Sequence, residues 1–115
     1  MSDSQIPDKQ PRGTEESNNP QPSVELTGFQ RDLLFTIARL EGKKPHGKTI
    51  KYQLEDYYSS EINTGRLYQN LRELTENGFI ETYPIDGRTK SYHLSSEGQR
   101  CLENHYKWMR ICLEY

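Results

Sequence analysis

Apolar residues are scarce in this chain, and no apolar run is longer than three residues. The hydrophobic fraction is 31% of 115 residues, and Leu33-Leu34-Phe35 is typical of the longest runs. A membrane-spanning helix needs about 20 consecutive apolar residues, so we expect neither a membrane span nor a signal peptide. The sequence therefore predicts one small cytoplasmic domain.

Cysteine is also rare. Cys101 and Cys112 are the only two, and both fall within one predicted helix with no CxxC pattern and no histidine at metal-ligand spacing. We expect them to be buried or half-buried thiols. A metal site or an interchain disulfide is the alternative interpretation.

Residues with catalytic chemistry do not cluster in the sequence. His46, His93 and His105 fall in a predicted turn, strand and helix respectively. No Ser-His-Asp set, carboxylate pair or metal-ligand spacing is evident. We therefore predict that the chain is not an enzyme and uses no metal and no cofactor.

Excess positive charge is absent as well. The net charge is −2, and the chain has 15 basic and 17 acidic residues. Residues 1–25 hold five of the acids and two of the bases, together with Pro, Ser, Asn and Gln, so we predict a disordered acidic tail there. The remaining 90 residues carry 13 basic and 12 acidic groups, so composition alone does not predict nucleic-acid binding.

Helical periodicity and capping residues divide the rest of the chain. Thr27 and Gln30 form a capping-box pattern at the start of a first helix, and Gly42 follows its end. A second helix is expected over about residues 48–57, with Ile50, Leu54 and either Tyr57 or Tyr58 facing inward. A third helix begins after Asn63 or Thr64 and ends at 77–78.

Two short strands and a last helix complete the pattern. Residues 79–83 and 90–94 flank Asp86-Gly87, a turn signal, which predicts a β-hairpin. Ser95 or Ser96 caps a final helix. The predicted class is mainly α with a small β-hairpin: a winged helix-turn-helix over residues 26–94, followed by a C-terminal helix over residues 95–115.

The third helix has one narrow apolar stripe, formed by Leu67, Leu71 and Leu74. Its remaining surface is polar, and in helix-turn-helix proteins the N-terminal half of such a helix meets base edges in the major groove of double-stranded DNA. Arg suits guanine, and Gln suits adenine. The candidate DNA-binding residues on this helix are Thr64, Gly65, Arg66, Tyr68, Gln69 and Arg72. The alternative is an ordinary amphipathic helix with a solvated polar face.

Basic residues outside this helix extend the candidate surface. Lys48 and Lys51 lie on the second helix, where phosphates would lie, and Arg88 and Lys90 lie at the predicted hairpin tip, where a wing touches DNA. A lysine cluster or a charged hairpin tip can also serve only solubility. These residues therefore support DNA binding as a group rather than singly.

Three segments together resemble the PadR family of transcriptional regulators. They are Gly65-Arg66-Leu67-Tyr68-Gln69-Asn70-Leu71-Arg72-Glu73-Leu74 with Gly78-Phe79-Ile80, then Asp86-Gly87-Arg88 with Ser91-Tyr92-His93-Leu94, and then Ser95-Ser96-Glu97-Gly98. The resemblance covers about residues 26–113. Two positions depart from the family pattern: many members have Pro where Gln69 stands, and an aromatic residue often stands at the position of Lys48.

The resemblance implies a dimeric, repressor-like DNA binder whose dimer contacts come largely from the last and first helices. It places Arg66 and Tyr68 at the start of the recognition helix and Arg88 on the wing. The last helix supports the dimer independently, because its apolar residues span too wide an arc for one small domain to cover. The expected dimer residues are Leu102, His105, Tyr106, Met109 and Leu113. The alternative is that this helix folds back on its own domain.

Two further interpretations remain open. A near-neutral winged helix can bind a protein instead of DNA. Tyr106 and Trp108 could also line an apolar pocket for a small-molecule effector at a dimer seam, although such residues are more often core or interface residues. The sequence favours a homodimeric, sequence-specific regulator that binds double-stranded DNA.

Overall fold

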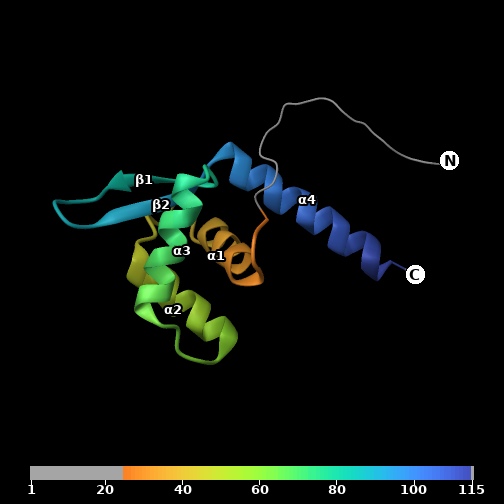
Figure 1. Cartoon of the computed structure of the whole chain (residues 1–115), viewed down its shortest axis with the longest axis horizontal. Coiled ribbons are helices and arrows are strands. Elements are labelled where there is room, and N and C mark those ends of the chain that lie inside the picture. The colour runs from red at the N-terminus through yellow and green to blue at the C-terminus, as the bar shows by residue number, and fades with distance from the viewer. Residues whose placement is uncertain (1–24, 115) are drawn as a thin grey trace.

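The structure is a computed structural model, and it describes residues 25–114. The elements follow the order α1 (Gly28–Arg39), α2 (Gly47–Tyr58), α3 (Thr64–Glu76), β1 (Ile80–Pro84), β2 (Lys90–Leu94) and α4 (Ser96–Leu113). Three helices pack together, the hairpin projects from one side of them, and α4 extends from the other (Figure 1). The predicted acidic tail lies outside the described residues apart from Glu25.

Side-chain caps set where the helices begin. Thr27 and Gln30 form both bonds of the predicted capping box, and Asn63 and Ser95 cap α3 and α4. The start of α2 differs from the prediction: His46 caps it through its ring, and Gly47 is its first residue. Gly78 ends α3 with a φ of +84°, a conformation that glycine adopts without steric cost.

The core lies between α1, α2 and α3. Leu33, Leu34, Ile37, Ile50 and Leu67 are fully buried there. Of the two alternatives at the end of α2, Tyr58 packs against this core, whereas Tyr57 is 75% exposed. Tyr58 also donates a hydrogen bond to Asp32 of α1, and burial together with this bond raises the pKa of Tyr58 to about 12.

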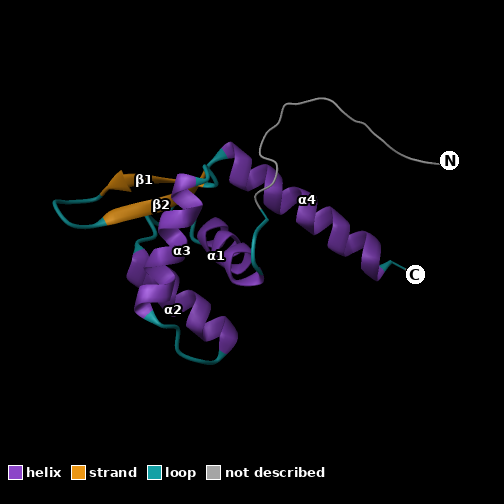
Figure 2. Cartoon of the chain, viewed as in Figure 1, coloured by secondary structure: helices purple, strands orange, loops and turns teal. Residues whose placement is uncertain are grey.

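The hairpin is antiparallel, with Ile80 opposite Leu94 and Pro84 opposite Lys90 (Figure 2). The first strand is shifted by one residue from the predicted 79–83, while the second matches the prediction. The connecting loop runs over residues 85–89, and the Asp86 carboxylate accepts hydrogen bonds from the amides of Arg88 and Thr89. These two bonds lower the pKa of Asp86. The aspartate thus orders the loop that carries Arg88.

The N-terminal end of α4 packs on the domain, and most side chains of its C-terminal half are exposed. Gly98 fits against the carbonyl of Phe79, and Leu102 is buried in the core cluster. Further along, Tyr106, Trp108, Ile111 and Leu113 are all more than half exposed. No helix among the described residues is both long and apolar enough to cross a membrane.

Candidate nucleic-acid interface

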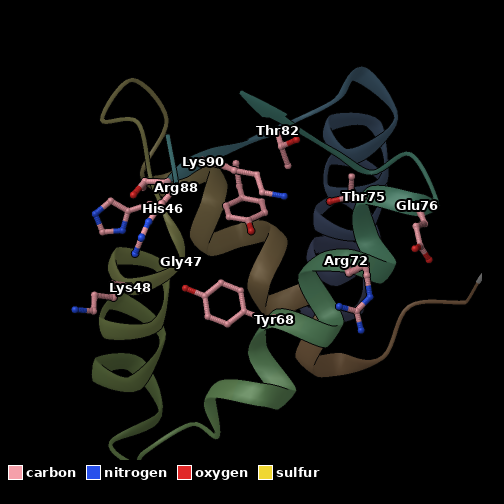
Figure 3. A pocket seen from close by; sticks show the side chains of 12 residues that line it. His46, Gly47, Lys48, Tyr68, Arg72, Thr75, Glu76, Thr82, Arg88 and Lys90 are labelled. Atoms are coloured by element: carbon pink, nitrogen blue, oxygen red, sulfur yellow. The ribbon is translucent and has the colours of Figure 1, made fainter. Parts of the chain in front are cut away.

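A cleft of about 740 Å³ lies where α2, α3 and the hairpin meet. Its walls are the first turn of α2, one side of α3 and one face of the hairpin (Figure 3). The residues that line it are His46, Gly47, Lys48, Tyr68, Arg72, Thr75, Glu76, Thr82, Arg88, Thr89, Lys90 and Tyr92. The cleft therefore combines the predicted recognition helix and wing in one surface.

A backbone hydrogen bond holds two of these walls together. The Tyr92 amide of β2 donates to the Pro45 carbonyl, two residues before α2, at 2.8 Å. This bond ties the hairpin to the start of α2. The wing is thereby placed beside the helix N-terminus.

Contact between Gly47 and Tyr68 joins α2 to α3. The Tyr68 ring reaches across the cleft with its hydroxyl toward Gly47 (Figure 3). A β-carbon on Gly47 would overlap that hydroxyl, so the close approach depends on glycine at this position. Tyr68 nevertheless remains 41% exposed.

The hairpin directs alternate residues into the cleft, as a strand's period of two requires. Lys90 and Tyr92 line the cleft from β2, and Thr82, which pairs with Tyr92, lines it from β1. Tyr83 and Ser91, one position along on each strand, are not part of the lining. The alternation separates a cleft-facing set of hairpin residues from an opposite set.

Positive charge predominates in the cleft. Lys48, Arg72, Arg88 and Lys90 line it, against the single carboxylate of Glu76. None of the four bases forms an ion pair with another residue in the described part of the chain. A concave surface with this balance attracts anions, although the domain as a whole is near neutral.

Arg66 lies elsewhere, against α1. Its guanidinium carbon is 3.8 Å from the centroid of the Phe29 ring, a cation–π contact. The same side of α3 bonds to α1 again, because the Gln30 side chain donates to Asn70 at 3.0 Å and to Glu73 at 3.1 Å. In this conformation Arg66 contributes to the α1–α3 packing rather than to the cleft.

Lys51 is also engaged within the domain. Its Nζ lies 2.7 Å from Oε2 of Glu55, and the same carboxylate oxygen accepts a hydrogen bond from the Ile62 amide at 2.8 Å. The bond from Lys51, followed by that from Ile62, lowers the pKa of Glu55, and the bond to Glu55 raises the pKa of Lys51. This network connects α2 to the turn that precedes α3.

The other predicted DNA contacts divide into two groups. Lys48, Tyr68, Arg72, Arg88 and Lys90 come together in the cleft. Thr64, Gly65 and Gln69 are exposed on the N-terminal half of α3 but lie outside the cleft lining. Sequence reasoning missed His46 and Tyr92; the alternation with Lys90 was the available signal for Tyr92.

Comparison with known proteins identifies the family. The model of the transcriptional regulator PadR-like family matches residues 37–104, more than half of the chain. This chain belongs to the PadR-like family of transcriptional regulators. No curated protein sequence matches it.

Solved structures agree with this PadR-like assignment. RosR of H. salinarum is 35% identical, with a TM-score of 0.69 over 76% of this chain and 77% of that chain. A complex structure of hsRosR-S1 is 37% identical, with a TM-score of 0.68 over 73% and 72%. A PadR family transcriptional regulator from Eggerthella lenta DSM 2243 shares the fold, at 23% identity and a TM-score of 0.56 over 73% and 79%. The winged-helix fold expected from the sequence is confirmed.

The predicted dimer residues of this PadR-like chain differ in accessibility. Leu102 is 5% exposed and is part of its own domain's core. His105 packs against Phe35 and Trp108, and Met109 borders a second cleft between α1, α2 and α4. Tyr106 and Leu113 are 55% and 70% exposed, so these two present apolar surface that the described domain does not cover.

The cysteines of the PadR-like chain differ from the expectation at one position. Cys101 is half-buried, as predicted, and burial raises the pKa of its thiol. Cys112 is exposed, because it lies on the part of α4 beyond the domain, so the prediction for it was wrong. No cluster of potential metal ligands occurs among the residues that the structure describes.

Proposed function

We propose that this PadR-like regulator binds double-stranded DNA sequence-specifically as a homodimer, with repressor-like action. The observation that carries the proposal is the basic cleft bounded by the third helix and the hairpin wing. Its positive charge complements the phosphate backbone. The exposed polar residues of α3 supply groups that can read bases.

The DNA contacts that we propose fall into two kinds. Tyr68, Gln69 and Arg72 read base edges, with Thr64 and Gly65 near the backbone at the start of α3. Lys48, Arg88 and Lys90 contact phosphates. Arg66 and Lys51 support the domain through Phe29 and Glu55. This division revises the roles expected from sequence for Arg66 and Lys51.

The homodimer proposal rests on the apolar surface at the end of α4. Tyr106 and Leu113, seven residues apart, lie on one side of α4 and are both exposed, and a second copy of α4 would cover them. Two-fold symmetry would place two recognition helices roughly 34 Å apart, one turn of DNA, on a near-palindromic site. Bound at a promoter, such a dimer would exclude competing proteins from that site.

A protein-binding role is the second candidate, and exposed aromatics on α2 favour it. Tyr52 and Tyr57 are 70% and 75% exposed, and large aromatic side chains are enriched at protein interfaces. That role does not account for the positive charge of the cleft. A small-molecule effector near Tyr106 and Trp108 also remains a prediction.

A DNA titration tests the proposal. The purified protein is titrated against its own promoter-region DNA and against a random duplex, each at two salt concentrations. We expect tighter binding to the promoter DNA and weaker binding at higher salt, because phosphate contacts release counterions. Equal, weak binding to both duplexes would favour the protein-binding role.

A further inference from the structure

Tyr92 is a buried polar residue whose hydroxyl lacks a partner. The residue is 7% exposed and lines the cleft. Within residues 25–114, its hydroxyl forms no hydrogen bond with another group, although its backbone amide is bonded to Pro45. A hydroxyl that lines a cleft and has no partner in its own domain can donate a hydrogen bond to a ligand bound there.

The groups around Tyr92 define the chemistry of that ligand. The backbone amides of Gly47 and Lys48 lie in the first turn of α2, where no carbonyl of the helix accepts a hydrogen bond from them. Lys90 lines the cleft on the same hairpin face and adds a positive charge. Glu76, the carboxylate in the lining, belongs to the last turn of α3. Several hydrogen-bond donors and positive charges around one point favour the binding of an anion, and a helix N-terminus favours a phosphate.

The protonation state of Tyr92 agrees with a donor role. Burial, and to a lesser extent the phenol of Tyr68, raises the pKa of Tyr92. The hydroxyl therefore keeps its proton at neutral pH and can donate it in a hydrogen bond to a charged oxygen.

We propose that the Tyr92 hydroxyl and the first-turn amides of α2 bind one phosphate of the DNA backbone. The inference rests on the proposed DNA-binding function. Because the Pro45–Tyr92 bond joins β2 to the start of α2, one phosphate held there sets the register of the wing and of α3 on the duplex together. Tyr92 is thus a positioning residue, and it contributes no sequence preference.

The test compares Tyr92→Phe with wild type on a mixed-sequence duplex and on promoter DNA. We expect affinity for both duplexes to fall by roughly the same factor, about ten-fold, as for a hydrogen bond lost to a charged acceptor. The salt dependence should not change, because a neutral hydroxyl releases no counterion. Thermal stability of the free protein should stay the same or rise, because the hydroxyl has no partner there.

Tyr83→Phe is the matched control. Tyr83 is on the opposite hairpin face, is 52% exposed and donates to Glu81 at 3.1 Å. Its loss should leave duplex affinity unchanged. A drop in thermal stability of Tyr92→Phe as large as its loss of affinity would indicate a purely structural hydroxyl and overturn the proposal.

Two outcomes separate this inference from the function on which it rests. If wild type binds neither duplex, both fail. If wild type binds and Tyr92→Phe binds equally well, only the phosphate assignment fails. Inorganic phosphate is the second probe, with sodium chloride at equal ionic strength as its control. Phosphate could stabilise wild type but not Tyr92→Phe while the substitution leaves duplex affinity unaffected. In that case the site binds a free anion, and the DNA assignment is overturned.

Discussion

The Tyr68 hydroxyl of α3 occupies the space that a β-carbon on Gly47 of α2 would fill. Gly47 is the first residue of α2, and Tyr68 lies in the N-terminal half of α3. The contact therefore places a side chain of α3 against the first turn of α2. It also keeps the Tyr68 ring in the basic cleft.

Gly47→Ala should displace Tyr68 and destabilise the domain. Overpacking in a core typically costs about 1–3 kcal/mol in the free energy of unfolding, and the cost here should be smaller because the Tyr68 ring is 41% exposed and can move aside. Urea unfolding measures the loss. Gly28→Ala is the matched control, because Gly28 is the first residue of α1 and an added β-carbon there meets nothing within 4 Å. In a Tyr68→Ala background, Gly47→Ala should cost almost nothing; an equal cost in both backgrounds would disprove the contact's role.

Arg72 and Arg66 should respond differently to alanine. Arg72 lines the cleft, so Arg72→Ala should weaken duplex binding by roughly 1–3 kcal/mol. Arg66 packs on Phe29, so Arg66→Ala should lower the unfolding free energy by about 0.5–1 kcal/mol and affect DNA less. Fluorescence anisotropy and urea unfolding measure the two quantities. Equal losses of affinity in both variants would restore Arg66 to the DNA interface.

The Glu55 network predicts a pH-dependent stability difference. Glu55 has a pKa below its ordinary value of 4.5 because it accepts hydrogen bonds from Lys51 and Ile62. A carboxylate with a lowered pKa stabilises the fold above its ordinary pKa, and the stabilisation is lost as the pH falls through the folded value. Wild type should thus unfold at a higher urea concentration than Glu55→Gln at pH 7, and the gap should close below pH 4.5.

Asp56→Asn is the control for that experiment, because Asp56 is the next residue on α2, is exposed and forms no ion pair with another described residue. Its urea midpoint should lie close to that of wild type across the same pH range. A Glu55→Gln gap that stays constant with pH would contradict the role assigned to the Glu55 charge.

The end of α4 should control assembly. Tyr106→Ala combined with Leu113→Ala removes exposed apolar surface, and a two-fold interface loses each side chain twice. Association should weaken by at least about a hundred-fold, as measured by sedimentation equilibrium. Circular dichroism should show an unchanged fold. Arg100→Ala, at an exposed N-terminal position of α4, is the control and should leave association unchanged. A monomeric wild type, or a double variant that dimerises as well as wild type, would show that this face of α4 is not the dimer interface.

Local signals in the sequence were enough to predict most of the elements. Thr27, Asn63 and Ser95 cap their helices because a short side-chain oxygen reaches an amide three residues on. Periodicity predicted the apolar stripe of the third helix and the second strand. The start of α2 was predicted to within one residue, but its cap was missed, because it is the ring of His46, a less usual capping residue.

The candidate site was predictable only in part. The leucine spacing predicted which residues of α3 face outward. Arg66 and Tyr68 lie on the two sides of that outward face, and the spacing did not distinguish them as DNA contacts. The structure separates them, because α1 lies beside one flank and α2 beside the other. The sequence likewise left open whether Tyr57 or Tyr58 faces the core, because that depends on which neighbouring helix lies beside each residue.

The sequence by itself determined the helices, the hairpin and the family, because capping, periodicity and turn chemistry act between residues close in the chain. Only the tertiary structure decided which polar side chains share one surface. Tyr92 lies beside the start of α2 because its amide bonds to Pro45, which is distant in sequence, and Arg66 lies outside the cleft because it packs on Phe29 of α1. Such contacts depend on how whole elements pack, and no local pattern encodes that packing.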